Sequence, residues 1–547
     1  MGRVRSTKGR SFINSSMSNK LLPEHYTLLK LDYLLAKQDI RTVPVAREDA
    51  ADDPRAEQFQ IEERAPAETS TEHPGEKGKV QTKIYELVHR GGRTFERART
   101  AWVNPSVATR LNQRKVATDW IRTLGNYIPI YFVGGYIRDK YFKKVSKDVD
   151  IIALVPLEEA KKIFDNLGIQ YTETSNAFAR LKFYVGDLKV DMISTTREGL
   201  YDNLRQRDFT VNSIAQSVTG QFYDPFHGLD DIKAKILRTP ANRSLDSFKE
   251  DPSRILRAAR FISELPVKPH QSLSSAMPEA SKEFQRLKAD RIGWELAKIL
   301  QAEKPWKGLS FLSSYGLIKH ICPDLANLKG LKQSGRRKDV FHHSLRSMQM
   351  AKSEDLILNL ALLFHDLGKG IVEKVGGNFP GHAKPGAIAA EKTLKRLGFN
   401  KSVVSRVSNL IANHKFVDEM KDDFDVDEAK KLVLELRGDL DRFFELCHAD
   451  AKAGSGGADD VKKVEKMVRN LKSTLPNEAG EDDESEIQKL DEVPHQEKNS
   501  KELLKSDKIM TDSVLDVIDE SMLFMMSEKY SLISDIDSLI DLADDRS

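Results

Sequence analysis

Two carboxylates, Asp148 and Asp150, lie two residues apart in the stretch Asp-Val-Asp-Ile-Ile. The run 149–155 is rich in β-branched residues, which predicts a strand. Alternate residues of a strand point to the same face, so we expect both carboxylates side by side. Paired oxygen ligands suit Mg²⁺, which bridges phosphates and activates a hydroxyl. Asp191, in the later run Val-Asp-Met-Ile, is a candidate third carboxylate.

A glycine pair, Gly134 and Gly135, closes an earlier β-rich run, 128–134. A helix is predicted from Tyr136, so backbone N–H groups at this junction can approach a triphosphate, and Arg138 can add a charged donor. Either pattern alone is a weak signal, because glycine pairs usually form turns and alternating aspartates often lie on solvated faces. In this order and at this spacing, they favour a nucleotide site.

More polar side chains suited to a nucleotide follow along the chain. Arg207 and Asp208 can anchor phosphate and sugar groups, and Asn212 can hydrogen-bond a ribose hydroxyl.

Asp251 and Arg254 lie three apart on a predicted helix and should therefore share a face. An acceptor beside a forked donor can imitate the Watson–Crick edge of a base. Arg257 and Arg260 continue this face toward the expected triphosphate. A solvated basic helix explains the arginine row equally well.

A histidine cluster forms the second candidate site, because six of the 13 histidines fall between residues 342 and 448. Imidazole and carboxylate ligands suit a divalent transition metal or Mg²⁺ and leave positions open for water and phosphate. The predicted ligands are His343, His365, Asp366 and Asp450.

Four further histidines of the cluster have less defined roles. His382 and His414 are assigned to substrate contact or to a second metal, and His342 and His448 are left ambiguous. A lone histidine on an apolar helix is usually structural, but five coincident elements favour a metal site.

Four motifs in one order resemble class II tRNA nucleotidyltransferases and bacterial poly(A) polymerases, of the polymerase-β-like superfamily. The resemblance covers roughly 128–300, and Gln206 stands where the family has an arginine. The motifs are Gly134-Gly-Tyr-Ile-Arg-Asp139 with Asp148-Val-Asp150, Arg207-Asp-Phe-Thr-Val-Asn212, Asp224-Pro-Phe-His-Gly-Leu-Asp-Asp231 and Glu250-Asp-Pro-Ser-Arg-Ile-Leu-Arg-Ala-Ala-Arg-Phe261.

The resemblance implies that Asp251 and Arg254 act as a protein template for C and then A. The histidine cluster resembles the HD superfamily, and head, helical neck and HD domain is the layout of gammaproteobacterial-type tRNA nucleotidyltransferases. That layout implies hydrolysis of 2′,3′-cyclic phosphates, 2′-nucleotides and phosphate esters by the HD domain.

The pattern of predicted strands and helices that must position these residues indicates an α+β fold. β-rich runs at 128–134, 149–155, 181–185 and 188–194 alternate with helical patterns, giving a mixed sheet, and helical periodicity dominates after about 225. The predicted segments are an N-terminal extension (1–114), a nucleotidyltransferase head (115–224), a helical neck and RNA-binding body (225–337), an HD domain (338–455), an acidic flexible linker (456–510) and a C-terminal helical segment (511–547).

Composition limits the partners and the cellular compartment that we expect for this protein. The 86 Lys and Arg residues nearly balance 83 Asp and Glu, a net charge of +3, so RNA must be met by a local basic surface. Two cysteines exclude a disulfide framework and suit a reducing, cytoplasmic compartment. The longest apolar stretch is too short to span a bilayer, so no membrane partner is expected. The basic residues 1–20 fit a transit peptide or a myristoylation pattern loosely, and a plain basic tail better.

We therefore expect a metal-dependent nucleotidyltransferase that adds C and possibly A to the 3′ end of tRNA without a nucleic-acid template. Its expected partners are the acceptor arm of tRNA, CTP and ATP, and no DNA. Poly(A) polymerase and a catalytically silent RNA-binding protein are the alternatives. A short connection, Gly-Leu-Tyr-Asp-Asn-Leu-Arg-Gln, separates Glu198 from Arg207, and family members with such a deletion add only C. The sharper hypothesis is efficient addition of CC and poor addition of the final A.

Overall fold

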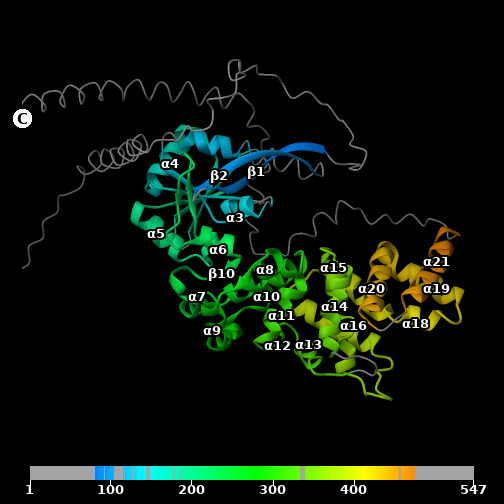
Figure 1. The fold of residues 1–547 in the computed structure, drawn as a ribbon. Coiled ribbons are helices and arrows are strands. Elements are labelled where there is room, and N and C mark those ends of the chain that lie inside the picture. Colours follow the sequence, from blue (N-terminus) through cyan, green and yellow to red (C-terminus); the bar gives the residue numbers. More distant parts are fainter. Residues whose placement is uncertain are drawn as a thin grey trace, which may run out of the picture. The chain divides into compact units, whose positions relative to one another are not determined.

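The computed structural model describes residues 80–90, 93–103, 115, 117–125, 128–142, 144, 148–175, 179–185, 188–332, 339–454 and 457–474. A mixed sheet with flanking helices is followed by helices alone, as the α+β prediction requires (Figure 1).

The head is built on a seven-stranded sheet with strand order β5-β6-β7-β4-β3-β8-β9. Its strands are β3 (Ile130–Val133), β4 (Val149–Ala153), β5 (Tyr171–Ser175), β6 (Ala179–Val185), β7 (Leu188–Ser194), β8 (Ala215–Ser217) and β9 (Phe222–Tyr223). Four of these, β3, β4, β6 and β7, coincide with the predicted β-rich runs. The helices of this region are α3 (Gly135–Tyr141), α4 (Leu157–Asn166), α5 (Arg197–Arg205) and the short η1 (Thr210–Asn212).

Strand register places the functional residues of the head. β4 pairs antiparallel with β3, which sets Asp150 opposite Val133, the residue before Gly134. β4 also pairs parallel with β7, which sets Asp150 beside Asp191. Carboxylates that are 41 positions apart in sequence thus become neighbours through strand pairing alone.

A two-stranded sheet, β1 (Val80–Arg90) with β2 (Arg93–Val103), lies within the predicted N-terminal extension. The sequence interpretation missed it, because the surrounding segment was assigned to an extension without folded elements. The β-branched and aromatic residues Val80, Thr82, Ile84, Tyr85 and Val88 were the available signal.

Helices form the neck after β9, with one small two-stranded sheet between them. The elements are α6 (Gly228–Ala234), β10 (Ile236–Leu237), η2 (Pro240–Asn242), α7 (Ser244–Glu250), α8 (Ser253–Glu264), β11 (Lys268–Pro269), α9 (Gln271–Ala280), η3 (Ser281–Arg286), α10 (Ala289–Leu300), α11 (Pro305–Ser314), α12 (Ile318–Ile321) and α13 (Pro323–Asn327). Helices α8 and α10 pack on one another and bury their apolar stripes.

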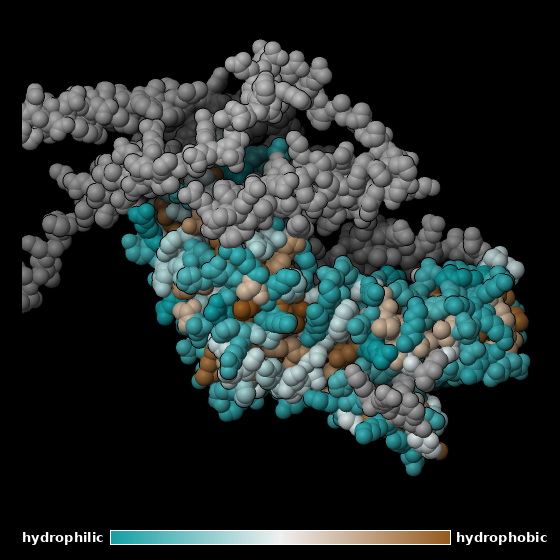
Figure 2. All heavy atoms as spheres, viewed as in Figure 1, coloured by the Kyte–Doolittle hydropathy of each residue, from teal (hydrophilic) through white to brown (hydrophobic). Residues whose placement is uncertain are grey.

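The histidine cluster is carried by a second group of helices. They are α14 (Val340–Ala351), α15 (Leu356–Phe364), η4 (Leu367–Gly370), α16 (Ala383–Arg396), α17 (Lys401–Asn413), α18 (Phe416–Met420), α19 (Val426–Leu436), η5 (Arg437–Asp439) and α20 (Leu440–Ala453). Hydrophilic side chains cover most of the described surface on the face drawn in Figure 2, as expected of helices that bury one stripe.

Helix α15 is the buried axis of this domain. The Asp355 side chain caps it by accepting from the Leu358 N–H at 2.8 Å, and the residues from Ile357 to Phe364 are all buried. Its one polar residue, Asn359, donates to the carbonyls of Leu300 and Ser353, both at 2.7 Å. These bonds satisfy the buried amide donors and tie α15 to the end of α10.

Helix α21 (Ala458–Thr474) corrects one predicted boundary. The region from 456 was assigned to a flexible acidic linker, but Val461, Val464 and Val468 recur at helical spacing and are buried. The predicted C-terminal helical segment lies outside the described residues. None of the helices in the described part of the chain is both long and apolar enough to cross a bilayer.

Candidate active sites

Three carboxylates lie near the start of β4 in the head. Asp148 is exposed just before the strand, whereas Asp150 and Asp191 are half-buried on neighbouring strands. Burial raises the pKa of Asp150; the Asp191 and Asp148 carboxylates add to the increase, and Arg207 opposes it. The Oδ1 atom of Asp191 is buried with no hydrogen-bond partner among the described residues. Crowded carboxylates and an unpartnered oxygen fit a divalent cation.

Gly134 lets the end of β3 approach this group closely. Its φ of 66° lies in the left-handed region, and a Cβ there would sit 2.9 Å from Asp150 Oδ2 and 2.8 Å from Arg207 Nη1. Any side chain would therefore displace the carboxylate or the guanidinium. The close approach seen here is to Asp150 and Arg207, and the predicted approach of the backbone to a triphosphate stays a prediction.

A chain of hydrogen bonds joins the predicted nucleotide-binding residues. Arg138 Nη1 donates to Asn212 Oδ1 at 2.8 Å, and Asn212 Nδ2 donates to Asp208 Oδ1 at 2.8 Å. Arg257, on α8, completes the chain by donating from Nε to Asp208 Oδ2 at 2.8 Å. Burial opposes ionisation of Asp208, but Arg257 and Asn212 hold its pKa well below its usual range.

Arg207 is the cation that acts most strongly on the pKa of Asp150. It donates from Nε to Asn203 Oδ1 at 3.2 Å and from Nη1 to the Asn212 carbonyl at 3.3 Å. Burial lowers the pKa of its guanidinium and Asp150 opposes that change. Arg207 is therefore fixed in place beside Asp150 before any substrate arrives.

The predicted shared helix of Asp251 and Arg254 is wrong. Asp251 lies between α7 and α8 with extended backbone (φ −140°, ψ 96°), and its Oδ1 accepts from the Ser253 N–H at 2.9 Å. The prediction overlooked Pro252. The ring of a proline disfavours helical backbone in the residue before it, so the helix is interrupted at Asp251. Asp251 instead acts as a capping residue of α8, and Arg254 stands in the first turn of that helix.

Arg254 is oriented by the head and by α7. Its Nη1 donates to Ser247 Oγ at 2.7 Å, and its Nη2 donates to the Gln206 carbonyl at 2.6 Å. The guanidinium is thus held close to the motif that begins at Arg207.

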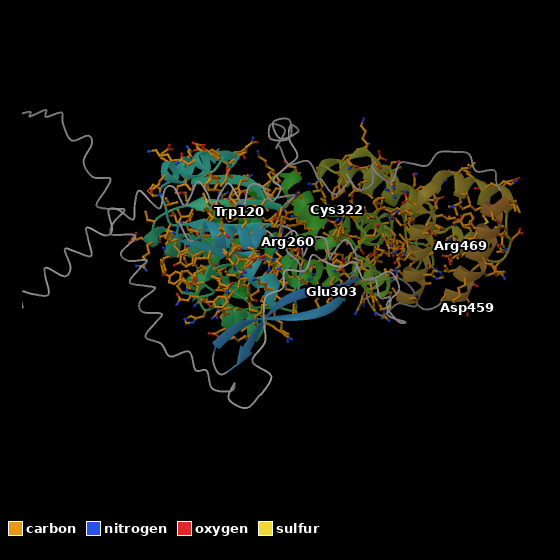
Figure 3. The ribbon with its side chains drawn as sticks, turned by 90° about the horizontal axis from the view of Figure 1, so that it is seen from above. Trp120, Arg260, Glu303, Cys322, Asp459 and Arg469 are labelled. Atoms are coloured by element: carbon orange, nitrogen blue, oxygen red, sulfur yellow. The ribbon has the colours of Figure 1, made fainter. Side chains whose placement is uncertain are left out.

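Arg260 points into the neck rather than along the expected row. It is 8% exposed, its Nη1 lies 3.3 Å from Glu295 Oε2, and its Nε lies 3.6 Å from Glu264 Oε1 (Figure 3 labels it). Arg291 Nη2 lies 3.2 Å from the other Glu295 oxygen and 3.3 Å from Ser253 Oγ. Sequence reasoning missed Glu295, whose only signal was a charged residue on the apolar face of α10.

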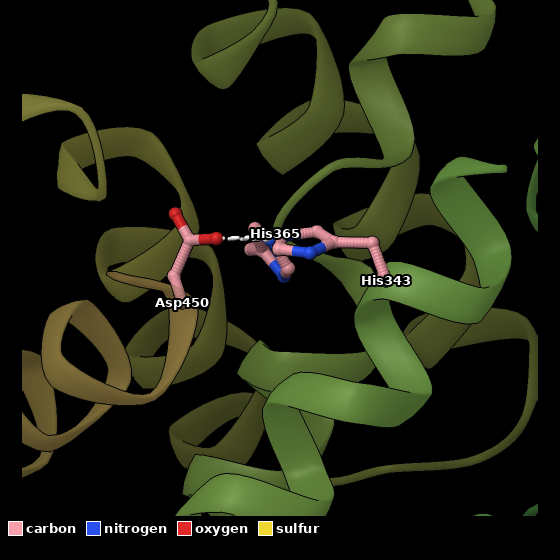
Figure 4. A group of neighbouring side chains, drawn as sticks. All are labelled: His343, His365 and Asp450. Carbon is pink, nitrogen blue, oxygen red and sulfur yellow. Dashed lines mark hydrogen bonds and ion pairs between the residues drawn. The ribbon is translucent and has the colours of Figure 1, made fainter. Parts of the chain in front are cut away.

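In the second site, His343, His365 and Asp450 converge from three helical segments (Figure 4). His343 Nε2 lies 2.6 Å from Asp450 Oδ1, and His365 Nε2 lies 3.7 Å from the same oxygen. Candidate ligand atoms of the three residues all lie within 4.8 Å of one another.

A second group, Asp366, His382 and His414, lies beside the first and meets the same distance criterion. Asp366 Oδ1 lies 3.3 Å from His382 Nε2 and 3.9 Å from His414 Nε2, whereas its Oδ2 lies 3.4 Å from His365 Nε2. Asp366 therefore stands between the two groups, with one oxygen toward each. Gly368 allows this packing, because a Cβ there would lie 1.9 Å from the His382 carbonyl.

Backbone carbonyls orient three of the imidazoles through Nδ1. His365 faces the Leu362 carbonyl at 3.0 Å, and His382 and His414 face the carbonyls of Phe379 and Ile411, both at 2.7 Å. A carbonyl only accepts, so each Nδ1 carries the proton and each Nε2 of the neutral ring presents a lone pair.

The unprotonated Nε2 atoms favour the binding of a cation. His382 Nε2 and His414 Nε2 lie 3.1 Å apart, and in the neutral rings neither has a proton to donate. Burial lowers the pKa of His414 to about 3, so this ring stays neutral at physiological pH. His365 Nε2 and Asp366 Oδ2 are buried without hydrogen-bond partners among the described residues. Such a donor set fits divalent cations.

The two ambiguous histidines lie outside both groups. His342 Nδ1 contacts Asp339 Oδ1 at 2.7 Å with its side chain 45% exposed, and His448 Nε2 contacts Glu465 Oε2 at 2.8 Å. Lys369 was overlooked, although it contacts Asp366 Oδ1 at 2.7 Å. Its i+3 spacing from Asp366 was the signal in the sequence.

Comparisons with known proteins match the head, the neck and the HD domain. Three family models match: a Poly A polymerase head domain over 130–238, a probable RNA and SrmB-binding site of polymerase A over 268–329, and an HD domain over 340–451.

Curated relatives extend the match. A CCA-adding enzyme of Streptococcus gordonii is 36% identical over 210 residues, which is 36% of this chain but only 51% of that protein. A multifunctional CCA protein of Psychromonas ingrahamii is 30% identical over 290 residues, covering 49% of this chain and 70% of that protein. An A-adding tRNA nucleotidyltransferase of Deinococcus radiodurans is 29% identical over 342 residues, covering 59% of this chain and 76% of that protein.

The fold also aligns with the solved structure titled Thermotoga maritima CCA-adding enzyme complexed with tRNA_CCA, at a TM-score of 0.47. That alignment has 18% sequence identity and covers 77% of this chain and 96% of the other. The shared domains and the long match at 30% identity define the relationship. The chain belongs to the family of CCA-adding enzymes and multifunctional CCA proteins.

Proposed function

We propose that this protein transfers nucleotides from CTP and ATP to the 3′ end of tRNA without a nucleic-acid template. The observation that carries the proposal is the convergence of Asp148, Asp150 and Asp191 beside Gly134 and Arg207. The carboxylates would hold Mg²⁺, which when bound activates the terminal 3′-hydroxyl and stabilises the leaving pyrophosphate.

The surrounding side chains have separate tasks in this proposal. Arg207 and Arg138 supply fixed positive charge to the triphosphate, since both are already oriented by hydrogen bonds. Asp251 and Arg254 read the base with an acceptor and a forked donor. In this proposal Arg260 does not contact the nucleotide. It pairs with Glu295 and so supports the position of α8. The helical body binds the acceptor arm through shape and phosphate contacts.

The test is incubation of tRNA lacking its CCA end with CTP and ATP, singly and together, followed by sequencing of the 3′ ends. We expect incorporation of C and none by Asp150→Asn. Strong extension of arbitrary RNA by ATP alone would favour the poly(A) polymerase alternative. Absence of incorporation with every divalent metal would favour a silent RNA-binding protein.

The choice of nucleotides is a finer proposal. The connection between β7 and Arg207 is largely α5, whose Thr196 cap accepts from the Gly199 N–H at 3.2 Å. A capped helix moves less readily than a flexible loop. It is therefore poorly suited to reorienting Asp251 and Arg254 from the recognition of C to the recognition of A. The curated relatives include both CCA-adding and A-adding proteins, so family membership leaves this open. Supplying tRNA that ends in CC with ATP alone decides it, and rapid conversion to CCA would refute restriction to C.

We further propose that the HD domain hydrolyses phosphate esters. Its two ligand groups would hold divalent cations, transition metal or Mg²⁺, which supply a water nucleophile at neutral pH. The 3.1 Å approach of bare nitrogens in His382 and His414 supports a second cation over direct substrate contact. Metal analysis of purified protein should find about one equivalent less metal in His382→Ala/His414→Ala than in wild type, and an unchanged content would contradict the second cation.

Localisation in the cytoplasm stays a prediction from cysteine usage. Fractionation of cells expressing a tagged full-length chain would check it.

A further inference from the structure

A cleft of about 1120 Å³ opens over the HD centre. Lys369, His382 and Asp450 line it at the centre, and residues of α16, α17, α18 and α19 form its walls. The cleft is large enough for an ester with a substantial organic group, which would enter with its phosphate toward the ligands.

Two lysines of this cleft differ in what they can do. Lys369 is 5% exposed and contacts Asp366 Oδ1 at 2.7 Å, so its charge is committed to a buried carboxylate. Lys415 has a 36% exposed side chain and pairs with Asp418, one turn further along. Both side chains reach solvent, and an i,i+3 pair with solvent access contributes little free energy, so a phosphate can replace Asp418 as the partner of Lys415.

The charge of Lys415 interacts with the carboxylates of the HD centre. Burial opposes protonation, but Asp418, and more weakly Asp450 and Asp366, raise the pKa of Lys415. Its neighbour in sequence, His414, has its Nε2 3.9 Å from Asp366 Oδ1. Lys415 lines the same cleft as the candidate ligands His382 and Asp450, so a phosphate bound in that cleft is within the region that Lys415 borders.

We propose that Lys415 binds the phosphate of the HD substrate by exchanging Asp418 for a phosphoryl oxygen, and that it favours dianionic phosphate monoesters over monoanionic diesters. The inference rests on the proposed phosphohydrolase activity. A monoester carries about −1.5 to −2 charges at pH 7, so one added cation stabilises it more than a diester. The bond to Lys415 is charge-assisted and therefore among the stronger hydrogen bonds.

Four variants test the exchange. Lys415→Met should raise the KM for 2′-AMP about tenfold to a hundredfold, and the KM for 2′,3′-cyclic AMP much less. Asp418→Asn should lower the KM for 2′-AMP, because Lys415 loses its competing partner. The double variant should lack that gain, which separates exchange from a simple loss of nearby negative charge. Lys431→Met is the matched control, because Lys431 lines the same cleft, has a 62% exposed side chain, and pairs with Glu428 at 3.8 Å.

Calorimetry measures how inorganic phosphate binds to the metal-loaded protein. This measurement tests the role of Lys415 independently of the proposed hydrolysis. Lys415→Met should weaken phosphate binding about tenfold or more relative to wild type and Lys431→Met. Equal binding by both lysine variants would overturn the role of Lys415, whatever the activity. Phosphate binding that depends on Lys415 in a protein that hydrolyses neither ester would instead refute only the phosphohydrolase proposal.

Discussion

The head and the HD domain both bring carboxylates together, but they enclose them to different degrees. In the HD centre, six candidate ligand residues form two groups, each with its ligand atoms within 4.8 Å of one another, and backbone carbonyls orient three of the rings. In the head, the described residues give no such closed group. Asp148 is exposed, and the site is held by Arg207 and by the close approach of Gly134.

This difference has a physical cause. Helices can aim long imidazoles at one buried point. Burial there lowers the pKa of His343 and His414, whereas at His365 the Asp366 carboxylate outweighs burial and raises the pKa. Short aspartates at the end of a sheet leave one side open, and a triphosphate can complete the coordination from that side. We infer that the HD centre is preformed, whereas the head site is completed by its substrate.

The largest expected effect comes from the head carboxylates. Asp150→Asn keeps the shape of the side chain but removes a ligand between Asp148 and Asp191. Nucleotide addition should fall by about a thousandfold or more, because electrostatic stabilisation of the transition state is lost. Addition is measured with labelled CTP, and ester hydrolysis by the same sample is the control. Near-normal addition would place the metal site elsewhere.

His365→Ala combined with Asp366→Ala should reduce ester hydrolysis by at least about a hundredfold, because one ligand is removed from each group. Incorporation of CTP should stay close to wild type, since the residues belong to a separate domain. Metal content gives a second readout. Loss of both activities in a folded variant would mean that the two sites are coupled, and the comparison between them would fail.

Gly134→Ala should lower nucleotide addition about tenfold to a hundredfold, because its Cβ would displace Asp150 or Arg207. The strained backbone should also cost on the order of 1 kcal/mol in the free energy of unfolding. Gly220→Ala is a matched control, since Gly220 has φ of 92° with no atom within 4 Å of a Cβ. Similar losses of activity in both variants would show that backbone strain, not displacement at the site, is the cause.

The smallest effect on activity is expected from Glu295→Gln. Removing this buried charge leaves Arg260 and Arg291 poorly compensated, so unfolding should become easier by about 3 kcal/mol. Nucleotide addition below the melting temperature should fall only a few-fold, through looser placement of α8. Glu264→Gln, at the 30% exposed partner of Arg260, should change stability by less than about 1 kcal/mol. Comparable denaturation midpoints for the two variants would contradict the role of the buried pair.

The sequence by itself determined much of this protein. Four β-rich runs, the Gly134 junction and the paired aspartates are local patterns, so composition and spacing were enough to predict them. Two candidate ligands of the HD centre, His365 and Asp366, could also be picked out from the sequence, because they stand at the end of an apolar helix. Local rules failed at Asp251, where Pro252 ends one helix before the next begins, and at 458–474, where acidic composition masked a buried valine stripe.

Only the tertiary structure decided which distant groups meet. Strand pairing sets Asp191 beside Asp150, and helix packing sets Glu295 against Arg260 rather than leaving that arginine for a nucleotide. The orientation of the imidazoles, with carbonyls on Nδ1 and bare Nε2 atoms 3.1 Å apart, likewise depends on how separate helices pack. Residue types and spacing predict which groups can do chemistry, but burial and distance between segments remote in sequence decide which of them face a cation and which neutralise one another.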